Sequence, residues 1–82
     1  MTQEQAVSAA DAAREDKQVP GHARAASAER QFIELGAGDP EKPSPVADVL
    51  VWLVRYVFDG GRWVELAVAD KTAEVVRVRR SG

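Results

Sequence analysis

The stretch VLVWLVRYVF, residues 49–58, is followed directly by Asp59-Gly60-Gly61, and together they decide the fold. β-Branched and aromatic side chains dominate the stretch, which is typical of a strand. An apolar run of this length also suits a buried helix, but the Asp-Gly-Gly sequence that follows favours a hairpin. The segment RWVELAV, residues 62–68, is then the returning strand. The sequence therefore predicts an antiparallel hairpin at its centre.

Both faces of the strand at 49–58 carry apolar side chains. Because successive side chains of a strand point to opposite faces, one face presents Leu50, Trp52, Val54, Tyr56 and Phe58, and the other presents Val49, Val51, Leu53, Arg55 and Val57. Such a strand is typical of a central position covered on both sides, or of one whose second face meets another molecule.

The remaining elements lie on either side of this hairpin. A helix is predicted at about 2–17, because Thr2 and Gln5 form a capping box and Pro20-Gly21 ends the segment. Its apolar stripe consists of alanines, which bury little area but allow close approach to a sheet. Further strands are predicted at about 26–35 and 74–80, and the loop 36–45 is rich in proline and glycine.

These elements predict one domain over residues 1–82, of the α+β class. The N-terminal helix packs on one face of a four-stranded antiparallel meander sheet. The last strand lies at a sheet edge, where Arg77, Arg79 and Arg80 protect it against edge-to-edge pairing.

Composition excludes several classes of protein. The 82 residues include no cysteine, so neither a disulfide nor a zinc–thiolate site is expected. The net charge is −2, which argues against a nucleic-acid partner, and no apolar run is long enough to span a membrane. Met1 as the native start predicts a cytoplasmic protein, whereas removal of a leader predicts an extracytoplasmic one; the compartment stays open.

Three short motifs, taken in order, resemble the PepSY domain of bacterial peptidase propeptides and small stand-alone proteins. They are the helix start TQEQAV at 2–7, the alternating Trp52, Val54 and Tyr56, and the run VADKTAEVV at 68–76. The closing motif of the family reads roughly Val-Asp-x-x-Thr-Gly-Glu-Val. Aligned on Thr72 and Glu74, this chain has Ala69 in place of the aspartate and Ala73 in place of the glycine.

The resemblance implies a helix packed on an antiparallel sheet in the cystatin-like manner. It also implies inhibition or regulation of peptidases and related protein binding, without a catalytic residue set. Ala73 would occupy a left-handed turn position, where alanine costs roughly 1 kcal/mol relative to glycine.

No constellation predicts catalysis, a metal or a cofactor. His22 is the only histidine and is expected to be a solvated loop residue, because no nucleophile or second base accompanies it. Asp39, Glu41 and Asp48 flank the proline-rich loop without the spacing of a calcium loop. Tryptophan beside arginine also suits single-stranded nucleic acid, but the acidic balance opposes this. A small-ligand carrier would need a pocket with polar groups, which the sequence does not reveal.

The second apolar face of the strand at 49–58 is the one functional indication that does not depend on the resemblance to a family. The alanine helix covers a single sheet face, so the second face needs a partner, or else the first segment or the proline-rich loop folds over it. We predict a non-enzymatic protein-binding or regulatory module that acts, by the resemblance, on a peptidase. The alternative is a structural module that forms a homodimer through the sheet. The candidate interface residues are Trp63, Arg55, Val49, Val51, Leu53 and Val57.

Overall fold

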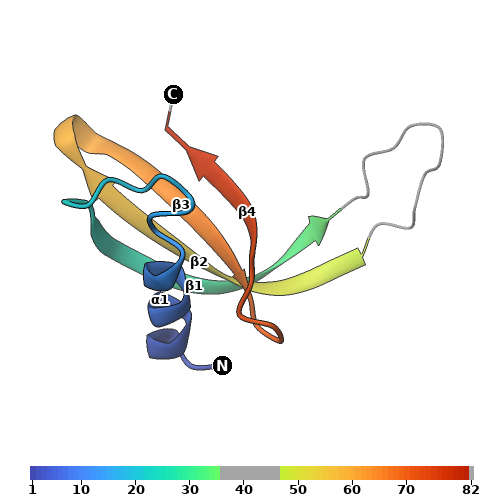
Figure 1. Cartoon of the computed structure of the whole chain (residues 1–82). Coiled ribbons are helices and arrows are strands. Elements are labelled where there is room, and N and C mark those ends of the chain that lie inside the picture. The colour runs from blue at the N-terminus through green and yellow to red at the C-terminus, as the bar shows by residue number, and fades with distance from the viewer. Residues whose placement is uncertain (36–46, 82) are drawn as a thin grey trace.

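A computed structural model describes residues 1–35 and 47–81. Its elements are α1 (Gln3–Ala12), β1 (Arg24–Leu35), β2 (Ala47–Phe58), the 3-10 turn η1 (Asp59–Gly61), β3 (Arg62–Ala69) and β4 (Val75–Arg80). The strands form one antiparallel sheet in the order β1-β2-β3-β4, with α1 on one face (Figure 1). The predicted α+β meander is therefore confirmed.

The central hairpin forms at the predicted position. Phe58 pairs with Arg62 across η1, and the register continues along the whole of β3. Gly60 and Gly61 have φ values of 68° and 82°, in the left-handed region that only glycine adopts without a steric cost. The Asp-Gly-Gly sequence thus fixes both the turn and the register of β2 against β3.

The helix begins as predicted. The Thr2 hydroxyl accepts the Gln5 backbone N–H at 3.2 Å, and the Gln5 side chain accepts the Thr2 backbone N–H at 2.8 Å. This is a complete capping box, which satisfies two backbone donors that have no partner within the helix.

The helix ends at Ala12, so the predicted extent of 2–17 is too long. Residues 13–18 form turns, and Gln18 takes a left-handed φ of 58°. The Arg14 side chain explains the reversal, because its Nη2 donates to three carbonyl oxygens of the following segment. These belong to Pro20 at 3.0 Å, Gly21 at 3.2 Å and Ala23 at 2.6 Å.

All strand boundaries lie within two residues of the prediction. β1 begins at Arg24 and β2 at Ala47, earlier than the predicted 26 and 49, because the two strands pair from Arg24↔Val57 to Leu35↔Ala47. β3 runs to Ala69 and β4 starts at Val75. The predicted loop 36–45 lies outside the described residues.

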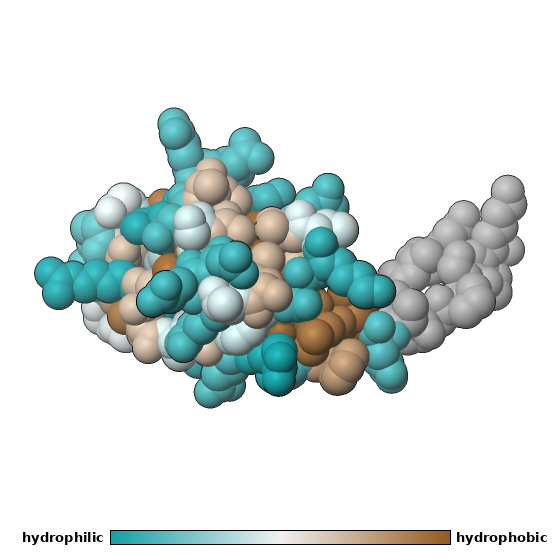
Figure 2. All heavy atoms as spheres, turned by 90° about the horizontal axis from the view of Figure 1, so that it is seen from below, coloured by the Kyte–Doolittle hydropathy of each residue, from teal (hydrophilic) through white to brown (hydrophobic). Residues whose placement is uncertain are grey.

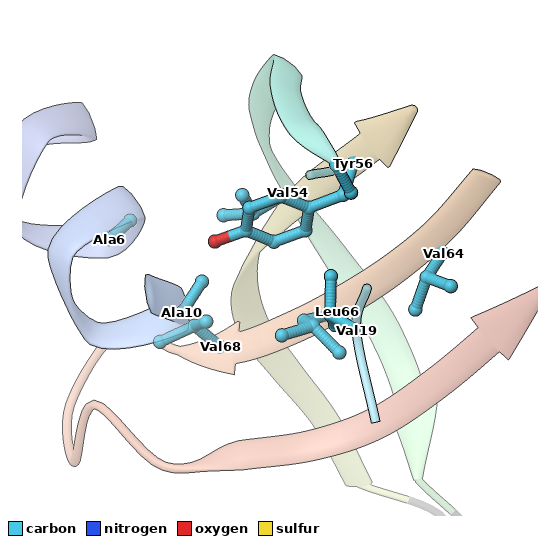
Figure 3. Close-up of a cluster of buried hydrophobic side chains, with 9 residues drawn as sticks. Ala6, Ala10, Val19, Val54, Tyr56, Val64, Leu66 and Val68 are labelled. Carbon is cyan, nitrogen blue, oxygen red and sulfur yellow. The ribbon is translucent and has the colours of Figure 1, made fainter. Parts of the chain in front are cut away.

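The main core lies between α1 and the sheet. Ala6 and Ala10 are fully buried, and Figure 3 shows them facing side chains of β2 and β3. Because alanine is small, the helix lies close to the sheet, and the sheet supplies the bulk. The large buried side chains of this cluster are Val54, Tyr56, Val64, Leu66 and Val68.

The sheet therefore has two different faces. We call the side under α1 the helix face; it carries Val54 and Tyr56 of β2 and Leu66 of β3. We call the opposite side the far face; it carries Leu53 of β2 and Ala67 of β3. The edge strands are β1 and β4, so the predicted edge position of the arginine-rich strand is confirmed.

Tyr56 connects the helix to the sheet through a polar contact at the edge of the core. Its hydroxyl donates to Asp11 Oδ1 at 2.6 Å, and the Arg14 guanidinium carbon lies 4.9 Å from the ring centroid. Burial, followed by the hydrogen bond to the Asp11 carboxylate, raises the pKa of the Tyr56 hydroxyl far above its ordinary value. The folded state therefore favours the protonated, neutral form of the Tyr56 side chain.

We expect Ala73→Gly to raise the free energy of unfolding by about 1 kcal/mol, measured by urea unfolding. Ala73 adopts a φ of 60° in the turn before β4, where a Cβ atom is strained. This confirms the left-handed position that the sequence predicted. The matched control is Ala9→Gly within α1, which we expect to lower the free energy by about 1 kcal/mol. Equal destabilisation by both changes would contradict strain at Ala73.

We expect alkaline pH to destabilise the protein through Tyr56. Below its unfolded pKa of about 10, the phenol is protonated in both states and its contribution is complete. Above that pH the unfolded chain loses the proton first, so the free energy of unfolding falls as pH rises. Tyr56→Phe should cost about 1 kcal/mol at neutral pH and remove this part of the alkaline decline.

Urea unfolding of both chains between about pH 8 and 11 measures the difference. Tyr56 is the only tyrosine, so absorbance titration follows its ionisation alone. An identical alkaline decline in the Tyr56→Phe chain would show that Tyr56 does not carry it.

Candidate functional site

The six candidate interface residues lie together on the far face. Alternation along β2 places Val49, Val51, Leu53, Arg55 and Val57 on one side of the strand, and Trp63 of β3 pairs with Val57. The described part of α1 packs over the opposite side of β1, β2 and β3. The first segment therefore does not cover the far face, and the proline-rich loop, the other predicted cover, lies outside the described residues.

A small second core supports this face. Val51 is 0% exposed and Ala67 1%, and they pack with Ile33 of β1 beneath the half-buried Val49, Leu53 and Val76. Val51 thus supports the surface and presents no area to a partner, which corrects its place among the candidate contacts. Leu53, Val49 and the 38%-exposed Val57 are the apolar groups that remain accessible.

Charged groups order the part of the far face near η1. Arg55 Nη2 donates to Glu65 Oε2 at 3.0 Å, and its guanidinium carbon lies 4.3 Å from the centroid of the Trp63 ring. Glu65 is only 6% exposed, so this carboxylate depends on its arginine partner. The stack holds Trp63 half-buried, in contact with Arg55 and still partly open to solvent.

β4 adds two further arginines to the far face. Arg77 pairs with Ala67, and Arg79 pairs with Glu65. The Nε atom of Arg77 is buried and has no hydrogen-bond acceptor among residues 1–35 and 47–81. A buried donor without an acceptor costs free energy, which an acceptor from outside these residues would recover.

The sequence prediction missed Glu65 and Phe32. The hairpin supplied a signal for Glu65, because a three-residue turn at 59–61 already places it opposite Arg55. Phe32 is 68% exposed on β1, opposite Leu50. Figure 2 shows strongly hydrophobic residues gathered beside the grey residues, where β1 ends and β2 begins. The β1–β2 register places Phe32 opposite Leu50, on the helix face and outside the candidate interface. Because no short turn sets this register, the position of Phe32 could not be predicted from the sequence.

The other candidate residues do not form a reactive site. His22 Nε2 lies 3.1 Å from Asp59 Oδ2, and both side chains are well exposed, at 60% and 81%. Asp39 and Glu41 lie outside the described residues, and Asp48 is exposed. Within the described ranges, no group of three or more histidine, cysteine or acidic residues is placed to hold a metal ion. No helix in this part of the chain is long and apolar enough to cross a membrane.

Two hollows lie in the described surface beside the turn that precedes β4. A wide, shallow groove lies between the end of α1 and the start of β4, lined by alanines and by charges of both signs around Asp16 and Lys17. A smaller hollow of about 290 Å³ lies between Asp48 and Thr72. Its Asp70 carboxylate already accepts Trp52 Nε1 at 2.9 Å and pairs with the chain N-terminus at 3.5 Å. The first hollow is too shallow to enclose a ligand, and the Asp70 carboxylate of the second is already paired, so neither has the form of a small-molecule site.

Comparison with protein-family models, curated proteins and solved structures found no match to this chain. The resemblance to the PepSY domain therefore remains a prediction from the sequence motifs. The fold and the composition of the far face are established by the structure of this chain alone.

We expect Leu53→Ala to cost much less stability than Leu66→Ala. Leu66 is fully buried under α1, so truncation leaves a cavity and lowers the free energy of unfolding by about 3 kcal/mol. Leu53 is half-buried on the far face, and about 1 kcal/mol is expected. Urea unfolding of the two chains measures both values. A loss at Leu53 as large as that at Leu66 would assign Leu53 to the core and remove it from the accessible surface.

Proposed function

We propose that this protein is a non-enzymatic protein-binding or regulatory module that contacts its partner through the far face. One observation carries the proposal: the candidate interface residues converge on the sheet face that α1 leaves uncovered. A sheet face with an apolar centre normally requires a second layer in a stable domain. A partner protein would supply that layer.

The composition of the far face supports protein recognition. Apolar area from Leu53 and Val57 lies beside a half-buried tryptophan that an arginine stacks upon. Tryptophan and arginine are enriched among the residues that contribute most to binding, and an apolar centre with a charged rim is typical of interfaces. The Arg55–Glu65 pair holds Trp63 in one position before binding, which lowers the entropy cost of association.

The finer proposal, that the partner is a peptidase, rests on the PepSY resemblance alone. The motifs that carry it lie mainly in the helix start, in β2 and in the turn before β4. They therefore indicate a class of partner without indicating which residues would touch it.

Photo-crosslinking in the native cells tests the proposal. A benzophenone amino acid replaces Leu53 in one chain and Val57 in a second, and the exposed Glu4 of α1 in a control chain. We expect protein adducts from the two far-face positions at several times the yield of the control, because the benzophenone would lie within an interface. Mass spectrometry identifies the adducts. Yields no higher than the control at both positions would overturn the proposal, and adducts without a peptidase would overturn only the finer one.

A further inference from the structure

Opposite charges occupy the two edges of the far face. One row of paired residues crosses all four strands: Glu29 of β1 pairs with Leu53, Leu53 with Ala67, and Ala67 with Arg77 of β4. The row thus reads acid, large apolar, small apolar, base. Its ends are three strand spacings apart, roughly 14 Å. Within residues 1–35 and 47–81, neither Glu29 nor Arg77 makes an ion pair.

The neighbouring row has a compatible order. Ser27 pairs with Arg55, Arg55 with Glu65, and Glu65 with Arg79. Its β1 end is neutral and its β4 end is basic. Its two central residues already form an ion pair within the chain.

We infer that the partner of the far face is a second copy of this chain, related by a two-fold axis that runs parallel to the strands. The inference rests on the proposed function, and it names as the occupant of the far face a second copy in place of the peptidase of the finer proposal. A two-fold axis that lies between two stacked sheets and runs parallel to their strands reverses the order of strands and keeps their direction. The β1 edge of each copy then lies over the β4 edge of the other, in the aligned packing common to stacked sheets.

This arrangement makes each row complementary to itself. Glu29 of one copy faces Arg77 of the other, and symmetry repeats the contact at the opposite edge. Leu53 of one copy lies above Ala67 of the other. Ala67 is itself buried and offers room in place of contact area, which suits interdigitation of the two apolar centres. In the neighbouring row, Arg55 faces Glu65, so the pair within each chain extends into a network of four charges.

The other two-fold axis in this plane, perpendicular to the strands, gives the opposite result. It keeps the order of strands, so Glu29 would face Glu29 and Arg77 would face Arg77. Like charges in contact at an interface oppose association. The charge pattern therefore selects one of the two symmetric arrangements, and it favours a second copy because the complementary surface is already present on the same chain.

Light scattering on the purified chain over a range of concentrations is the first test. We expect a mass approaching twice 8.9 kDa. Glu29→Arg should weaken association roughly tenfold or more, because symmetry repeats each like-charge contact twice. The double change Glu29→Arg with Arg77→Glu should restore it, because opposite charges face each other again with exchanged signs.

Glu4→Arg on α1 is the matched control, since it makes the same change of charge away from the far face. Circular dichroism verifies that each chain folds. If the Arg77→Glu change prevents folding, the comparison of Glu29→Arg with Glu4→Arg still decides, because Glu29 is exposed. If Glu29→Arg weakens association no more than Glu4→Arg does, the inference is overturned.

A wild-type chain that stays monomeric at high concentration would also overturn it. If positions 53 and 57 then crosslink a different protein in cells, the proposed function stands with another partner. If they crosslink nothing above the control, both proposals fail.

Discussion

The contact of Asp11, Tyr56 and Arg14 determines where the helix lies, and the rest of the structure depends on that placement. Tyr56 has no exposed surface and donates to Asp11 at the last turn of α1. Arg14 lies against the ring and binds the backbone carbonyls that lead into β1. One cluster thus connects the helix end, the connecting segment and the centre of the sheet. A hydrogen bond from a buried hydroxyl to a half-exposed carboxylate also specifies a single docking position, because any shift would leave the Tyr56 hydroxyl buried and unpaired.

This docking explains why the far face has to be stabilised in another way. α1 is a ten-residue helix whose buried side chains are alanines, so it covers only the helix face. No second helix covers the far face in the described part of the chain. Side chains of the sheet stabilise it by packing against one another, with Val51 and Ala67 buried beneath Leu53, Val49 and Val76. This packing stabilises the sheet and still leaves apolar side chains partly exposed on the far face. The protein thus combines a fixed core on one side of the sheet with a partly exposed apolar surface on the other.

The sequence predicted those features that short-range chemistry determines. The capping box at Thr2 and the glycine turn at Gly60 depend on neighbours within a few residues, and the turn also fixes the β2–β3 register. The end of the helix was missed because it depends on where the Arg14 side chain reaches in the folded chain. The β1–β2 register was out of reach, since no tight turn joins these strands and many pairings satisfy the same alternation. Hence the convergence of β2 and β3 residues on the far face could be predicted, and the acid that β1 contributes could not.

A single irregularity in the last strand decides the charge of the far face. The pairing of β3 with β4 shifts between Ala67 and Val68, so Val75 pairs on the helix face while Val76 joins the far-face cluster. This β-bulge reverses the alternation that follows. Arg77 and Arg79 therefore lie on the far face, whereas Val78 packs against the helix-face core and Arg80 donates to the carbonyls of Lys17 and Gln18. Without the bulge, a regular strand would put Arg77 under the helix, where a buried charge is costly. The arginines that protect the sheet edge thus also give the far face a basic side opposite the acid of β1.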